Sequence, residues 1–104
     1  METERRSVPR HTFIAHAELS DEGRTTRLAV RISDISTKGC YVDMIHPLPE
    51  GTHITLKIMD SSGSFQTRGR IVYSVPQLGA GVAFLDPTPE LTAQIERSLA
   101  HAMR

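Results

Sequence analysis

The chain has little of what many functional sites are built from. Among its 104 residues there is no tryptophan and a single cysteine, Cys40, beside three phenylalanines and two tyrosines. One cysteine cannot form an intramolecular disulfide, so we expect a reducing, cytoplasmic location. The sequence also lacks an apolar run that approaches the length of a membrane-spanning helix, which is about 20 residues. The first residues lack the apolar stretch of a secretory signal, so we expect no direct insertion into a membrane.

Net charge is absent as well, because 12 Lys and Arg residues balance 12 Asp and Glu residues. Proteins that coat nucleic acid neutralise many phosphates, and those that bind single strands stack bases on exposed aromatic rings. We therefore expect no nucleic-acid partner. The alternative is that the chain is a small β-barrel that binds single-stranded nucleic acid. A small anionic ligand at one local basic site stays compatible with this composition.

The sequence patterns of common catalytic and metal sites are missing too. None of the five histidines lies four residues from another, as in a zinc protease helix, and no cysteine pair is present. Cys40 lies in an apolar alternation, which favours a small core residue. Gly79-Ala80-Gly81 is not followed by a helix, so it is no dinucleotide-binding motif. We expect no enzyme, no metal and no cofactor.

Apolar residues, at 38% of the chain, instead alternate with polar ones, as in half-buried strands. Turn-forming residues separate the alternating runs, so neighbouring strands must pair antiparallel and form a small barrel or sandwich. On this alternation Tyr73 shares the inward positions with Ile71 and Val75. The runs cover residues 13–19, 28–32, 40–44, 54–58, 65–75 and 82–84.

The C-terminal segment has a helical pattern. Thr88 can cap a helix whose first residue is Pro89. Apolar residues then recur every fourth position, at Leu91, Ile95, Leu99 and Met103. This spacing predicts one apolar stripe on a helix of about four turns that packs on the barrel or over one of its mouths.

Residues 1–12 have no hydrophobic periodicity and are expected to form a flexible arm. The arm contains Arg5 and the pair Arg6 and Arg10, which are separated by three residues. Each guanidinium can direct two N–H groups onto a phosphate or onto the O6 and N7 atoms of guanine. Two arginines at this spacing are common, so a solvated basic tail is the alternative.

A second polar group spans Asp34-Ile35-Ser36-Thr37-Lys38-Gly39, between two predicted strands. An ionised Asp34 accepts hydrogen bonds and suits the N1–H and N2–H groups of guanine, while Ser36 can donate and accept. Gly39 permits a positive φ or the close approach of a ligand or a second backbone. The alternative is an ordinary turn in which Asp34 and Ser36 cap their own backbone.

Together, Arg-x-x-x-Arg and Asp-x-Ser-x-x-Gly on an all-β chain of this length resemble the PilZ domain family. The turn Leu48-Pro49-Glu50-Gly51 and the last strand, Gly79-Ala80-Gly81-Val82-Ala83-Phe84, also resemble that family. The resemblance runs from Arg5 through the C-terminal helix. It implies an all-β fold with a C-terminal helix, namely a six-stranded antiparallel β-barrel over residues 13–104 that carries the flexible arginine arm, 1–12.

The resemblance further implies a bacterial receptor for the second messenger cyclic di-GMP. It assigns the guanine Hoogsteen edges and the phosphates to Arg6 and Arg10, with Arg5 as an additional stacking or phosphate contact. Arg5 beside the motif favours an intercalated ligand dimer over a monomer.

On the barrel, the resemblance assigns guanine binding to Asp34 and Ser36, with Gly39 shaping the turn beneath the base. It places Gly81 where the ligand approaches the backbone. Such receptors relay the signal to a separate partner protein that controls motility, exopolysaccharide or biofilm formation. The alternative is a PilZ-like protein-interaction module that does not bind nucleotide.

Overall fold

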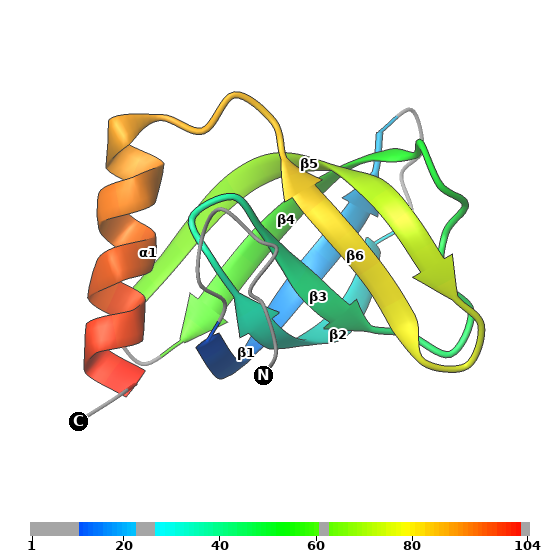
Figure 1. The fold of residues 1–104 in the computed structure, drawn as a ribbon, viewed down its shortest axis with the longest axis horizontal. Coiled ribbons are helices and arrows are strands. Elements are labelled where there is room, and N and C mark those ends of the chain that lie inside the picture. Colours follow the sequence, from blue (N-terminus) through cyan, green and yellow to red (C-terminus); the bar gives the residue numbers. More distant parts are fainter. Residues whose placement is uncertain (1–10, 23–26, 61–62, 103–104) are drawn as a thin grey trace, which may run out of the picture.

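Six antiparallel strands close into a barrel, and one helix follows the last strand (Figure 1). The structure, a computed structural model, describes residues 11–22, 27–60 and 63–102. The strands follow one another around the barrel in the order β1-β2-β3-β6-β5-β4, and β4 pairs with β1 to close it. The predicted six-stranded barrel with a C-terminal helix is confirmed. The elements are β1 (His11–Asp21), β2 (Arg27–Ile35), β3 (Gly39–Asp43), β4 (His53–Asp60), β5 (Gly63–Val75), β6 (Gly79–Phe84) and α1 (Pro89–Ala102).

The first strand begins at His11, whose backbone pairs with Ile35 of β2. The strand therefore includes residues 11 and 12, the last two of the predicted arm. The apolar alternation begins only at Phe13, but the backbone ladder does not depend on side-chain polarity. Arg5, Arg6 and Arg10 lie outside the described residues.

The core fills the barrel with the alternating apolar positions of the strands. Leu19, Ile32, Val42, Leu56 and Ile58 are fully buried. Each of them lies on the inward parity that the sequence predicts, which is the period of two expected of strands with one buried face. The outer face carries the polar residues and the candidate ligand site.

Two β-bulges change the direction of side chains on this outer face. In β2 the register with β3 shifts by one residue between Ile32 and Asp34. In β5 the register with β6 shifts between Ile71 and Tyr73, so that Val72 is the additional residue. A bulge moves the following residue to the opposite face. The predicted inward position of Tyr73 is therefore wrong, and its side chain is 39% exposed.

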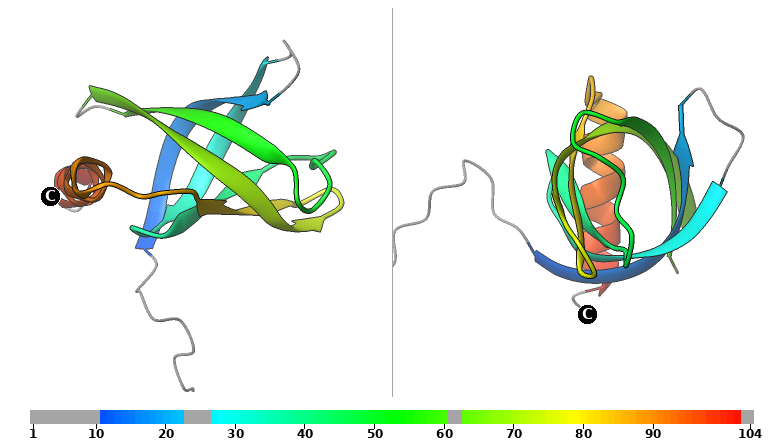
Figure 2. Two further views of the ribbon diagram at one scale, coloured as in Figure 1. Left: turned by 90° about the horizontal axis from the view of Figure 1, so that it is seen from above. Right: turned by 90° about the vertical axis from the view of Figure 1, so that its right-hand side faces the viewer.

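Helix α1 lies across one end of the barrel and packs against β1 and β5 (Figure 2). The predicted cap is present, because the backbone N–H of Leu91 donates to Thr88 Oγ1 at 3.0 Å. Leu91, Ile95 and Ser98 are buried beneath the helix, and Leu99 packs against the core. Met103, the last residue of the predicted stripe, lies outside the described residues. Within the described ranges, no helix is both long and apolar enough to cross a membrane.

Candidate functional site

The turn between β2 and β3 is built by the hydroxyl of Ser36. The backbone N–H of Lys38 donates to Ser36 Oγ at 3.1 Å, and the N–H of Ser36 donates to the Gly39 carbonyl at 2.8 Å. The Ser36 hydroxyl itself donates to the same Gly39 carbonyl at 3.4 Å. Its side chain is 6% exposed. Ser36 therefore has the turn-forming role that the sequence left open as an alternative.

Gly39 allows this turn to lie directly against β6. Gly39 pairs with Ala83, and a Cβ at Gly39 would collide with the Val82 carbonyl oxygen. The N–H of Phe84 donates to the Lys38 carbonyl at 2.9 Å. This hydrogen bond, next to the Gly39–Ala83 pair, also holds the turn against β6. The sequence suggests two reasons for glycine here, a positive φ or a close approach of backbone. The structure shows the close approach, because among the described residues the glycines with positive φ are Gly51 and Gly63.

Asp34 belongs to a row of outward positions that crosses four strands. Its Cα partner on β3 is Tyr41, the partner of Tyr41 on β6 is Gly81, and the partner of Gly81 on β5 is Tyr73. The two bulges place Asp34 and Tyr73 in this row. One continuous strip of the outer surface thus carries a carboxylate at one end and an aromatic ring at the other.

The two tyrosine rings lie over the glycines of β6. A Cβ at Gly81 would stand 2.6 Å from Tyr73 Cζ and 2.8 Å from its Cδ2, while a Cβ at Gly79 would stand 2.9 Å from Tyr41 Cε2 and Cζ. The ring centroids of Tyr41 and Tyr73 are 6.2 Å apart, with planes inclined by 35°. This spacing is within the range of favourable aromatic pairs. The glycines leave the space in which the rings rest against the barrel.

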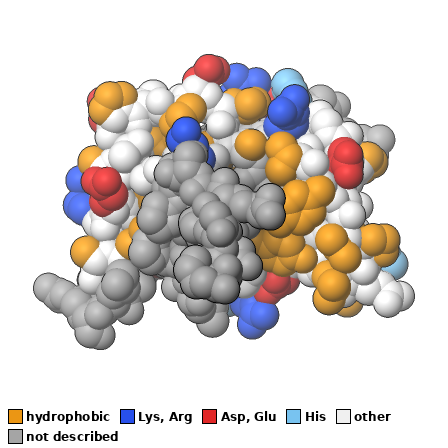
Figure 3. All heavy atoms as spheres, in the orientation of Figure 1, with side chains coloured by type: hydrophobic (Ala, Val, Ile, Leu, Met, Phe, Trp, Pro, Cys, Tyr) orange, Lys and Arg blue, Asp and Glu red, His pale blue; other side chains and the backbone are white. Residues whose placement is uncertain are grey.

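The Tyr41 hydroxyl of this strip has a raised pKa. Burial raises the pKa of Tyr41 above its ordinary value of 10.0, and the neighbouring Tyr73, Asp43 and Asp34 raise it further. Tyr41 therefore stays protonated and can donate a hydrogen bond. Beside it, Arg31 Nη2 forms an ion pair with Asp43 Oδ2 at 2.8 Å. Figure 3 shows hydrophobic side chains grouped on the face that carries β3 and β6, with charged side chains around them.

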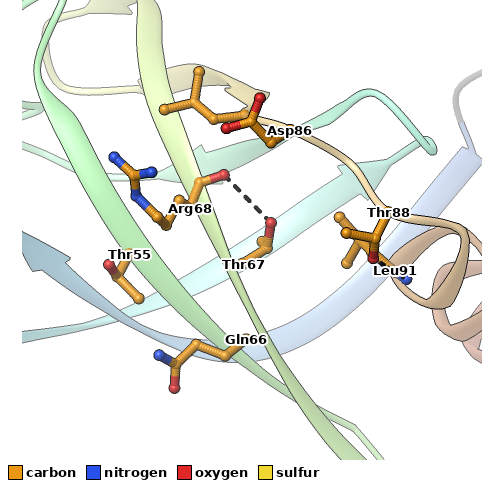
Figure 4. A pocket seen from close by; sticks show the side chains of 8 residues that line it. Thr55, Gln66, Thr67, Arg68, Asp86, Thr88 and Leu91 are labelled. Carbon is orange, nitrogen blue, oxygen red and sulfur yellow. Dashed lines mark hydrogen bonds between the residues drawn. The ribbon is translucent and has the colours of Figure 1, made fainter.

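Two hollows lie near the start of α1. A pocket of about 430 Å³ separates the β2–β3 turn from the helix, and Thr37, Lys38 and Glu96 help to line it. A second pocket, of about 280 Å³, lies between β5 and the segment before α1, where Arg68 and Asp86 line it (Figure 4). The second pocket contains none of the residues predicted as ligand contacts. Among the described residues, no group of three or more His, Cys, Asp or Glu side chains comes together as a metal site.

The structure brings four of the predicted site residues to one part of the surface. Asp34, Ser36 and Gly39 share the β2–β3 turn, and Gly81 lies in the same cross-strand row as Asp34. The ring of Tyr73 covers Gly81, so contact between a ligand and that backbone would require the ring to move. These assignments stay predictions, as do those of Arg5, Arg6 and Arg10.

The sequence pattern did not single out Tyr41 or Tyr73 as candidate site residues. The alternation that places Cys40 and Val42 inside places Tyr41 on the outer face, whereas an unbroken alternation along β5 would place Tyr73 inside. The one available signal was the pair of glycines at positions 79 and 81, because small residues on a strand mark places where another group approaches closely.

Comparisons with known proteins agree with this architecture. The family model described as the PilZ domain matches residues 4–101. The PilZ domain of YcgR from Escherichia coli, solved with c-di-GMP, is 16% identical with a TM-score of 0.75, and the match covers 90% of this chain and 88% of that one. The PilZ domain of CeSA from a cellulose-synthesizing bacterium is 15% identical with a TM-score of 0.72, covering 92% and 99%.

The longer YcgR structure from E. coli, in complex with c-di-GMP, is 17% identical with a TM-score of 0.82. That match covers 98% of this chain and 47% of YcgR, so the chain spans about half of that protein. At these identities the structural likeness shows the fold. No curated protein matches the chain.

Proposed function

The chain belongs to the PilZ domain family, and on this premise we propose that it is a receptor for cyclic di-GMP and not an enzyme. The observation that carries the proposal is the structure of the β2–β3 turn. Hydrogen bonds through Ser36 and the close approach of Gly39 to β6 fix this turn. The turn thereby holds Asp34 at the edge of an outward-facing strip. A rigid turn lets a carboxylate read a base edge with little ordering cost. The YcgR structures were solved with c-di-GMP, which makes it the ligand to test first.

The two motifs supply complementary chemistry. We expect Arg6 and Arg10 to bind the two phosphates and the guanine Hoogsteen edges, because guanidinium groups form paired hydrogen bonds with both. Asp34 accepts from the N1–H and N2–H groups of a guanine. The hydroxyl bond from Ser36 to Gly39, at 3.4 Å, is long for an O–H donor. Its proton can therefore turn to the ligand while the Lys38 N–H keeps the turn closed.

The arm is the part of the proposal that produces a signal. We expect residues 1–10, the part of the predicted arm that precedes β1, to become ordered over the barrel when ligand binds, with Arg5 adding a contact that favours an intercalated ligand dimer. Ordering a segment converts binding into a change of shape that a partner protein can detect. Hydrogen exchange of residues 1–10 tests this step, and equal protection with and without c-di-GMP would contradict it.

Calorimetric titration with c-di-GMP, with GMP as the control ligand, tests the receptor function itself. The parent protein should bind c-di-GMP selectively, and Arg10→Ala or Asp34→Ala should bind at least tenfold more weakly, as expected when a charge-assisted contact is lost. Arg97→Ala is the matched control, because Arg97 lies on the exposed side of α1 and bonds to Gln94. It should bind like the parent.

The titration also separates the alternative. An unfolded variant is excluded by comparing far-ultraviolet circular dichroism spectra before titration. A folded parent that does not bind c-di-GMP at high micromolar concentration would identify a PilZ-like protein-interaction module. If it binds, we propose that the complex acts on a separate effector protein that controls motility, exopolysaccharide or biofilm formation.

A further inference from the structure

Tyr41 and Tyr73 are the only tyrosines of the chain, and the fold places both on the outer strip that begins at Asp34. Each ring rests against a glycine of β6, Tyr41 at Gly79 and Tyr73 at Gly81. The side chain of Tyr73 nevertheless remains 39% exposed. Part of this ring therefore packs on the barrel at Gly81, and part of it stays open to solvent.

We propose that Tyr41 and Tyr73 form a stacking platform for one guanine base of cyclic di-GMP, while Asp34 reads the other base. This inference rests on the proposed receptor function and adds a base-binding subsite to it. Aromatic side chains bind bases through their π-faces, and the contact does not depend on a hydrogen-bond pattern. The platform therefore adds affinity, and the Asp34 turn adds selectivity for guanine.

The spacing of the two ends requires a ligand with two bases. Tyr41, Gly81 and Tyr73 are one, two and three strands away from Asp34 in the row. The rings meet over β6, two strands from Asp34, which corresponds to about 10 Å at the usual strand spacing. A single guanine stacked there cannot also reach the Asp34 carboxylate. A cyclic dinucleotide carries its two bases on opposite sides of one ring and can occupy both positions.

The pair of rings also has a plausible structural role, which the test must separate from binding. Aromatic side chains over glycines cover exposed strand backbone and stabilise sheets. If the rings have only that role, replacing one of them lowers the amount of folded protein. The folded fraction would then still bind the ligand with the affinity of the parent. Burial raises the pKa of Tyr41, as do the neighbouring Tyr73, Asp43 and Asp34, so a base on the platform meets a protonated Tyr41 hydroxyl.

The first test is calorimetric titration of the whole chain with c-di-GMP for three proteins: the parent, Tyr73→Phe and Tyr73→Leu. Phenylalanine keeps the ring, so Tyr73→Phe should bind like the parent. Leucine still covers Gly81 but has no π-face, so Tyr73→Leu should bind about tenfold more weakly. Thermal unfolding of each variant confirms that folded protein is titrated. Parent-like affinity of a folded Tyr73→Leu would overturn the platform.

A second measurement needs no variant. With no tryptophan in the chain, its ultraviolet emission comes from the two platform tyrosines. Stacking of guanine should quench this emission in proportion to the bound fraction found by calorimetry, after correction with free N-acetyltyrosinamide at the same ligand concentrations. Binding without quenching would overturn the platform and leave the receptor function intact. Absence of any c-di-GMP binding by the parent would overturn both.

Discussion

Replacing Gly39 with alanine is expected to destabilise the barrel through a collision that the backbone cannot avoid. The new Cβ would collide with the Val82 carbonyl oxygen and stand 3.2 Å from the Val82 carbonyl carbon and 3.4 Å from Ala83 Cα. All three atoms belong to β6, which is paired with β3 on one side and β5 on the other. The strand therefore cannot shift without breaking a ladder.

The magnitude follows from two opposing terms. Overpacking of a well-packed region costs about 1–3 kcal/mol. Replacing glycine with alanine recovers about 0.4–1 kcal/mol by restricting the unfolded chain. With the middle of each range, the net loss is about 1.3 kcal/mol, which lowers the thermal midpoint of a domain of this size by roughly 5–10 °C.

Gly81→Ala is the matched comparison, because there the Cβ meets a side chain instead of backbone. The obstacle is the ring of Tyr73, which is 39% exposed and can rotate away. Gly81→Ala should therefore cost less stability than Gly39→Ala. The double variant Gly81→Ala/Tyr73→Ala should show a coupling, since removing the ring also removes the collision.

Urea unfolding followed by far-ultraviolet circular dichroism measures these differences for the parent and four variants: Gly39→Ala, Gly81→Ala, Tyr73→Ala and the double variant. An unchanged midpoint for Gly39→Ala would refute the reasoning, and so would a larger loss at Gly81 than at Gly39. Equal slopes with denaturant across the series would show that the variants differ in stability and not in the compactness of the unfolded chain.

Three further predictions concern the helix and one surface ion pair. Thr88→Ala removes the cap bond to Leu91 and should lower the free energy of unfolding by about 1 kcal/mol, measured with urea. Ile95→Ala empties a position with 0% exposure and should cost about 2–5 kcal/mol in the same assay; a loss near zero would mean that α1 does not pack on the barrel. The hydrogen bond from Arg68 lowers the pKa of Glu22 below its ordinary value of 4.5. The stabilisation that the ionised Glu22 gives the folded protein is complete above pH 4.5 and is lost as the pH falls through the lowered pKa. The thermal midpoints of the parent and Glu22→Gln should therefore converge in acid. A difference between the two midpoints that does not change with pH would contradict this.

Most of the barrel could be predicted because its strands alternate in a simple way. Leu19, Val42 and Leu56 are buried at the positions that the period of two assigns to them. The helix start could be predicted from Thr88 and Pro89, whose cap and first-turn chemistry are local. Such features depend on neighbouring residues in the sequence, so a single sequence contains the information for them.

The outer surface was harder to predict because it depends on pairing between distant strands. A single additional residue, Val72, reverses the direction of Tyr73, and nothing local marks the bulge. The need for glycine at position 39 arises from the Val82 carbonyl on another strand. Asp34, Ser36 and Gly39 could be grouped from their spacing, whereas the close approach of the Tyr41 and Tyr73 rings depends on β6, which pairs between β3 and β5.

Closure of the barrel restricts how a second protein can recognise this domain. Each of the six strands has a hydrogen-bonded neighbour on both sides, since β4 returns to β1. Within the described ranges, therefore, no strand is free along a whole edge, and only short stretches, such as residues 27–30 of β2 beyond β3, could accept an added strand. The same closure protects the domain from edge-to-edge aggregation. If the proposed receptor function holds, an effector would therefore recognise mainly side chains, and a bound ligand would signal by changing which side chains the surface presents.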